Sequence, residues 1–179
     1  AEEQGLSFRM GVIYADISKG DAKKALSEDR ISPLEPLENI TEDDIDRTER
    51  IVAQMGHEPV DKALDEGCEV IVAGRCYDPV SFAAPAVREG FDPGLAYHMG
   101  KILECAAIAA SPADGRDCVL GILEKDSFRL KALDPKRKFT RVSTSAHSLY
   151  EKSDPYNLPG PGGSLNLAGS VFEELENGE

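Results

Sequence analysis

Cys68-Glu69-Val70-Ile71-Val72-Ala73, followed by Gly74-Arg75-Cys76-Tyr77-Asp78-Pro79, is the stretch that decides the fold. Its first six residues are rich in β-branched and apolar side chains, which is typical of a strand buried in a parallel sheet. A loop that contains glycine follows, and we expect Asp78 to cap a helix whose first residue is Pro79. A strand that passes through a loop into a helix favours a layered α/β structure.

The residues before this stretch extend the same pattern. Phe8–Ala15 is a second apolar run and predicts another buried strand, which Lys19–Leu26 follows as a short helix. Thr41 begins a capping box, so we expect a helix from Thr41 through Met55. Glu58 or Pro59 then begins a helix that ends at Glu66, before a glycine. Strands and helices therefore alternate, as they do around a parallel sheet.

The pattern changes after residue 111. A helix rich in alanine is expected over 93–110, and two apolar runs at 118–124 and 128–132 predict a β-hairpin. We expect two parts in the α/β class. Residues 1–111 form a layered Rossmann-like core with parallel strands, and residues 112–179 form a smaller mixed α/β portion that contains the hairpin and packs on the core.

Composition excludes several classes of protein. The chain of 179 residues has 33 acidic and 20 basic side chains and a net charge of −13, which disfavours binding to nucleic acid and to anionic membranes. No apolar run approaches 18 residues, the length that predicts a membrane-spanning helix. The four cysteines match no zinc pattern, so we predict no metal site and reduced thiols in a cytoplasmic protein.

The chain begins without methionine, in what reads as the last turn of a helix. We therefore expect an interior fragment of a longer protein.

The first candidate site is the loop after the central apolar run. Gly74 would let a ligand approach the backbone, and Arg75 would bind a carboxylate or phosphate, with Asp78 in the same binding loop. The alternative is structural, because Asp78 can cap the helix and Arg75 can pair with a nearby carboxylate. Spacing alone leaves both interpretations open.

The second candidate site is a polar tract in the last third of the chain. His147 is positioned to move a proton near neutral pH, and Glu151, four residues later on a helix, to orient its ring. We expect that helix to begin at Thr144 or Ser145. Asp154 is the third candidate catalytic residue, and Tyr150 a candidate for substrate binding. The alternative is a capped surface helix with ordinary ion pairs.

A third candidate is the loop Pro159-Gly160-Pro161-Gly162-Gly163. Gly162 and Gly163 are predicted to contribute to substrate binding, because glycine loops admit a ligand close to the backbone. The loop lacks the lysine and hydroxyl residue of a phosphate-binding Walker loop. The alternative interpretation is a rigid turn that shapes the surface.

Three runs of residues resemble the acyclic terpene utilisation, or AtuA-like, family. They are Gly56–Leu64 with the strand and loop that lead to Asp78-Pro79, then Gly100–Cys105, and then Ala146–Pro155 with its trailing Pro-Gly-Gly. Lys101 stands where family members usually have histidine. The family takes its name from growth on citronellol and geraniol, and its members are usually longer than this chain. The resemblance therefore implies a role in such catabolism and an interior position in a longer protein.

Two functions follow as hypotheses. In the first, the chain is an enzyme or enzyme subunit that acts on a small organic acid or its acyl-CoA thioester, and Arg75 and His147 line one pocket. In the second, it is a non-catalytic domain that docks a partner or completes a larger fold. The sequence identifies no cofactor. We expect a homo-oligomer, or further regions of a parent protein, as partners.

Overall fold

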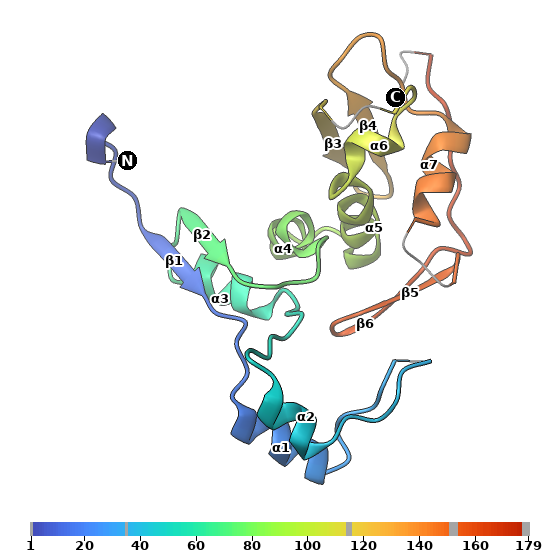
Figure 1. Cartoon of the computed structure of the whole chain (residues 1–179). Helices are drawn as coiled ribbons and strands as arrows, with labels where there is room; N and C mark the ends of the chain where they lie inside the picture. Colours follow the sequence, from blue (N-terminus) through green and yellow to red (C-terminus); the bar gives the residue numbers. More distant parts are fainter. Residues whose placement is uncertain (1, 35, 114–115, 151–153, 177–179) are drawn as a thin grey trace.

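The computed structural model describes residues 2–34, 36–113, 116–150 and 154–176. Within these residues it is a mixed α/β structure with one parallel pair of strands and two antiparallel hairpins. Figure 1 shows the parallel pair beside one helix, a separate pair of helices below it, and the remaining elements gathered around α5 (Pro93–Leu103). The α/β class is confirmed. The layered Rossmann-like core is not, because the described parallel sheet contains two strands.

The parallel pair contains the strand predicted from the central apolar run. β1 (Met10–Ile13) pairs with β2 (Val70–Ala73) in register, from Met10 opposite Val70 to Ile13 opposite Ala73. α3 (Glu58–Asp65) lies against one side of both strands (Figure 1). The elements that precede α3 besides β1 are η1 (Glu2–Gln4), α1 (Lys19–Ser27) and α2 (Glu42–Arg47).

The prediction of a helix from Thr41 to Met55 is wrong after Arg47, where α2 ends. Thr41 does form the predicted capping box with Asp44, but α2 ends where the backbone of Thr48 becomes extended, with φ −67° and ψ 133°. The following residues run beside the ends of both strands instead. The Ala53 N–H donates to the Ala15 carbonyl at 2.8 Å, and Met55 N–H donates to the Arg75 carbonyl at 3.2 Å. These bonds to the segments that follow β1 and β2 replace the helical ones.

α4 (Val80–Arg88) and α5 are packed closely together. Gly100 makes this approach possible, because a Cβ at its position would lie 2.9 Å from the Pro79 carbonyl oxygen. The prediction that Asp78 caps α4 is wrong, since Pro79 occupies the cap position and Asp78 pairs with Arg75. The long helix expected over 93–110 is divided into α5 and α6 (Ala106–Ala109), because the backbone leaves the helical region in between.

The last third of the chain packs against α5. β3 (Val119–Leu123) and β4 (Phe128–Ala132) form the predicted hairpin. α7 (Arg141–Ser148) is capped by Thr140 through a bond to the Ser143 N–H, and this cap lies four residues before Thr144, the earlier of the two predicted positions. β5 (Asn157–Gly160) and β6 (Gly163–Asn166) form a second hairpin where only a loop was expected.

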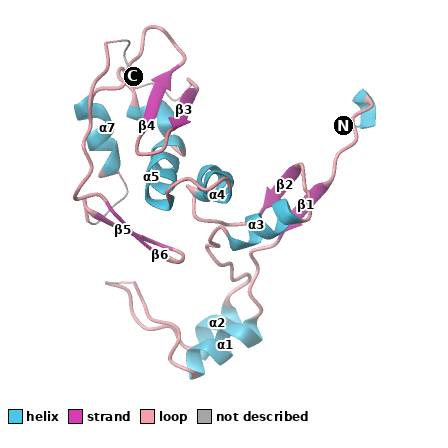
Figure 2. Cartoon of the chain, turned by 180° about the vertical axis from the view of Figure 1, so that it is seen from behind, coloured by secondary structure: helices cyan, strands magenta, loops and turns pink. Residues whose placement is uncertain are grey.

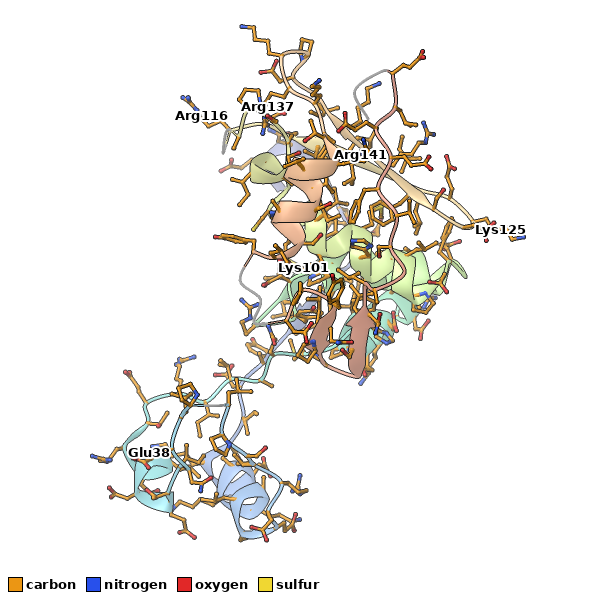
Figure 3. The ribbon with its side chains drawn as sticks, turned by 90° about the vertical axis from the view of Figure 1, so that its right-hand side faces the viewer. Glu38, Lys101, Arg116, Lys125, Arg137 and Arg141 are labelled. Atoms are coloured by element: carbon orange, nitrogen blue, oxygen red, sulfur yellow. The ribbon has the colours of Figure 1, made fainter. Side chains whose placement is uncertain are left out.

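The main hydrophobic core lies between α5, α6 and the β3–β4 hairpin. Its buried members are Met99, Ile102, Ala109, Ala110, Leu130, Ala132 and Phe139. Lys101, which is also on α5, lies above the β5–β6 hairpin in Figure 3. Glu38 lies far from it in the same view, beside α1 and α2.

His98 is a buried histidine at the edge of this core. Its ring meets Phe128 and Phe172 edge-on, with centroid distances of 5.1 Å and 5.8 Å. Burial lowers the pKa of His98 from 6.5 to about 4, because the apolar surroundings disfavour the imidazolium ion. The ring is therefore neutral at pH 7.

This burial predicts a stability that depends on pH. Between pH 6.5 and about 4 the unfolded chain binds a proton that folded His98 does not, so stability is lost as the pH falls. The loss due to His98 is about 1.4 kcal/mol per pH unit in that window. Urea unfolding of the wild type and of His98→Phe at several pH values measures it, since acidic groups shared by both proteins cancel in the difference. Equal pH slopes in the two proteins would contradict the prediction.

Candidate functional site

The predicted binding loop after β2 forms local contacts. The Arg75 guanidinium donates to the carboxylate of Asp78, and both side chains are about half exposed, at 46% and 48%. A Cβ on Gly74 would meet Ala15 at 2.9 Å, so this glycine admits the neighbouring chain segment. None of the cavities described below is lined by these three predicted residues. The structure thus contains the arginine–carboxylate pair that the sequence left open as an alternative.

The predicted catalytic tract lies on and after α7. His147 is buried, its ring stacks on that of Tyr150 with centroids 5.8 Å apart, and both line a cavity of about 320 Å³. Glu151 lies outside the described residues, so its predicted contact with His147 stays a prediction. Asp154 accepts the N–H groups of Tyr156 and Asn157 at 2.7 Å and 2.9 Å, and these bonds lower its pKa. In these contacts Asp154 orders the turn into β5.

The structure does not bring the Arg75 and His147 tracts into one cavity. α4 and α5 lie between the end of β2 and α7, and Figure 2 shows the same separation from behind. No cavity described among residues 2–34, 36–113, 116–150 and 154–176 has both side chains in its lining. A shared site of these two tracts has no support from this arrangement.

A different cavity, of about 260 Å³, brings together four segments of the chain, one of which contributes Tyr77. It lies between the residue that precedes α3, the beginning of α5 and the β5–β6 hairpin. Its lining residues are His57, Tyr77, Pro93, Gly94, Tyr97, Leu158 and residues 160–165. We call it the hairpin cavity. It includes Gly162 and Gly163, two of the residues predicted to bind substrate.

The hairpin cavity is shaped by turn and cap chemistry. Asp92 begins α5 by accepting the Leu95 N–H at 2.9 Å, which fixes the first turn of that helix. Gly160 lies under the ring of Tyr77, where a Cβ would come within 2.7 Å of a ring carbon. Gly162 has φ +85°, a conformation that favours glycine, and no atom lies within 4 Å of where its Cβ would be. The hairpin is therefore closely packed on one side and open at its tip.

His57 and Asp61 form a pair at one wall of the hairpin cavity. His57 occupies the cap position of α3 but makes no capping hydrogen bond, and its Nδ1 lies 2.6 Å from the Asp61 carboxylate. When Nδ1–H donates to that carboxylate, the lone pair of the neutral ring is on Nε2. The pair thus fixes the orientation of the imidazole and leaves one nitrogen able to accept a proton.

Two stacked tyrosines form the adjoining wall. The rings of Tyr77 and Tyr97 are 6.3 Å apart and nearly parallel, and the ring of His57 lies 6.5 Å from Tyr97. Burial is the main cause that raises the pKa of Tyr97, and the negative charges of Glu58 and Asp61 raise it further. The Tyr97 hydroxyl therefore remains protonated. That hydroxyl is buried and has no hydrogen-bond partner within the described part of the chain. A proton donor and a proton acceptor therefore border one hollow.

Sequence reasoning missed this pair of groups. The spacing of His57 and Asp61, four residues apart across the start of a helix, was a visible signal for an oriented histidine. Nothing in the sequence placed Tyr97 beside them, since it lies 40 residues later.

Among the described residues no group of three or more His, Cys, Asp and Glu side chains is suited to hold a metal ion. No helix of that part has the length and apolar character needed to span a membrane.

Comparison with known proteins gives one match. The model of a family described as acyclic terpene utilisation family protein AtuA matches residues 1–112. The matched residues include two of the three runs that carried the resemblance. They also include His57, Asp61 and Tyr97 at the hairpin cavity, whereas the β5–β6 hairpin lies beyond them. No curated protein and no solved structure matches the chain.

Proposed function

Because this chain belongs to the acyclic terpene utilisation family AtuA, we propose that it is an enzyme or enzyme subunit acting on a small organic acid or its coenzyme A thioester. Family membership suggests the setting, a role in acyclic terpene utilisation. The hairpin cavity is our proposed site. The observation that supports it most directly is the oriented His57 next to the buried hydroxyl of Tyr97.

The chemistry that suits this pair is proton transfer at the carbon beside a carbonyl. Nε2 of His57 would take the proton, and the electron pair of the C–H bond would move onto the carbonyl oxygen as an enolate. The Tyr97 O–H would donate a hydrogen bond to that oxygen, where negative charge develops. Asp61 would stabilise the imidazolium ion that forms. Gly162 and Gly163 carry no side chain at the open tip of the hairpin, which leaves room for the rest of the substrate.

This proposal predicts a loss of proton exchange on substitution of His57. Incubating branched acyl-CoA thioesters with the protein in D₂O, and following deuterium at the carbon beside the carbonyl by mass spectrometry, measures the reaction. His57→Gln should slow exchange by about 10²- to 10⁴-fold, with smaller losses for Asp61→Asn and Tyr97→Phe. Tyr156→Phe, a change at an exposed tyrosine outside the hairpin cavity, is the matched control and should exchange at the wild-type rate. Wild-type exchange in folded His57→Gln would exclude the assigned role.

A second candidate function is the docking of a partner, and one observation favours it. The face of the β1–β2 sheet away from α3 is apolar and open: Met10, Val12 and Val72 are 56%, 51% and 52% exposed. Parallel sheets are normally covered on both faces, so we infer that this pair belongs to a larger layered core, Rossmann-like in type. The exchange experiment separates the two functions, because a purely docking domain gives no exchange above buffer with any thioester.

A further inference from the structure

A larger cavity, of about 430 Å³, lies along a different part of the α5 surface from the hairpin cavity. Its walls come from α5, from β4 and from the segment 167–176 that crosses them. That segment is held by the Leu167 N–H, which donates to the Tyr156 carbonyl at 2.7 Å, and by Glu174, which accepts the Arg141 N–H at 2.9 Å. We call it the strap cavity. Its volume is in the range of cavities that bind small organic molecules.

His98 is the buried polar group that faces the strap cavity. The residue is 7% exposed, its Nε2 atom has no hydrogen-bond partner in the described ranges, and it lines the cavity. Phe128 and Phe172 flank its ring edge-on, at 5.1 Å and 5.8 Å between centroids. Buried polar atoms are rarely left without a partner, because the loss of water is then uncompensated. The position therefore suits a ligand that completes this hydrogen bond.

The surroundings of His98 select the kind of ligand. Leu95, Val171 and Leu175 add apolar surface to that of the two phenylalanines. The charged lining groups are two acidic and two basic residues, so they add no net charge. They are Asp126, Glu173, Arg129 and Arg141. The neutral imidazole would supply no positive charge to a carboxylate buried against it.

We propose that the strap cavity binds an uncharged aliphatic molecule that has a single hydroxyl or carbonyl group, with that group hydrogen-bonded to His98. The apolar chain of the ligand lies against the phenylalanine and leucine side chains. A hydroxyl group can donate to or accept from the neutral imidazole, and a carbonyl group can accept from it. This site is separate from the hairpin cavity and does not depend on the function proposed there.

Titration of the full chain with 1-octanol tests the proposal, with octanoate as the charged analogue of equal length. We expect 1-octanol to raise the Tm of the wild type and to bind at least ten times more tightly than octanoate. His98→Phe keeps an aromatic ring but removes the nitrogen atoms, and it should bind 1-octanol at least ten times more weakly. His98→Gln restores a polar group and should recover part of that affinity.

A direct readout on the wild type keeps the test independent of the variants. The ¹⁵N chemical shift of the His98 imidazole should change as 1-octanol is added, and the shifts of His57 and His147 should not. The proposal is overturned if the wild type binds octanoate as tightly as 1-octanol, if folded His98→Phe binds like the wild type, or if the His98 nitrogen shifts stay constant at saturation.

Discussion

Arg137→Met is expected to lower the free energy of unfolding by about 3–5 kcal/mol, the range seen when one partner of a buried ion pair is removed. The Arg137 side chain is 2% exposed and donates to Asp117 at 2.6 Å and to the Pro112 carbonyl at 2.8 Å. A further N–H donates to the Ala107 carbonyl at the end of the main core. Methionine fills similar space without a donor. The substitution therefore leaves a buried carboxylate and two carbonyl groups without these bonds.

Urea unfolding at pH 7 measures the effect of Arg137→Met. Arg30→Met is the matched control, because Arg30 pairs with Glu28 at 2.7 Å but both side chains are exposed, at 59% and 45%. Exposed pairs contribute about 0–1 kcal/mol, so this control should change little. Similar losses in the two variants would show that the guanidinium does not hold the segments together.

Lys101→Met is expected to have an effect of comparable size, about 3–5 kcal/mol. Lys101 donates to the carboxylate of Glu104 three residues later, and the two side chains are only 5% and 7% exposed. The substitution removes the ammonium group from beside the Glu104 carboxylate, which is buried at the C-terminal cap of α5. Burial is the main cause that raises the pKa of Tyr77, and the negative charge of Glu104 is the second. The Glu104 charge therefore influences a residue that lines the hairpin cavity.

A double-mutant cycle distinguishes the ion pair from simple loss of packing. Lys101→Met with Glu104→Leu removes both charges, so it should be less destabilising than the sum of the two single substitutions. The four unfolding free energies from urea titration give the coupling energy. Additive losses would mean that the two side chains contribute independently, contrary to the pairing seen at the end of α5.

Local chemistry in the sequence predicted part of the fold. The β-branched run Val70–Ala73 and the two apolar runs joined at Lys125–Ser127 are strands, as expected from composition and spacing. The helix from Thr41 to Met55 was overextended because its apolar spacing also suits extended residues, which pair with Ala15 and Arg75. Such partners lie far away along the chain and leave no local signal.

The second hairpin and the candidate site depended still more on tertiary contacts. Pro159 and Gly160 read as a loop, yet they belong to a strand that, among the residues described, pairs with β6 alone and so offers an edge where proline is tolerated. His57, Tyr97 and Gly163 meet only when α3, α5 and that hairpin are in place. The sequence predicted that Gly163 binds substrate, and this glycine lies in the lining of the hairpin cavity.

The proposed function requires that the ligand binds in the hairpin cavity. Backbone ¹H–¹⁵N shift mapping during titration with a branched acyl-CoA thioester tests it most directly. We expect the largest changes on Gly94, Tyr97, Gly162 and Gly163, and we expect Tyr97→Phe to weaken binding. Changes confined to the residues around Arg75 or His147, with the hairpin amides unmoved at saturation, would contradict it.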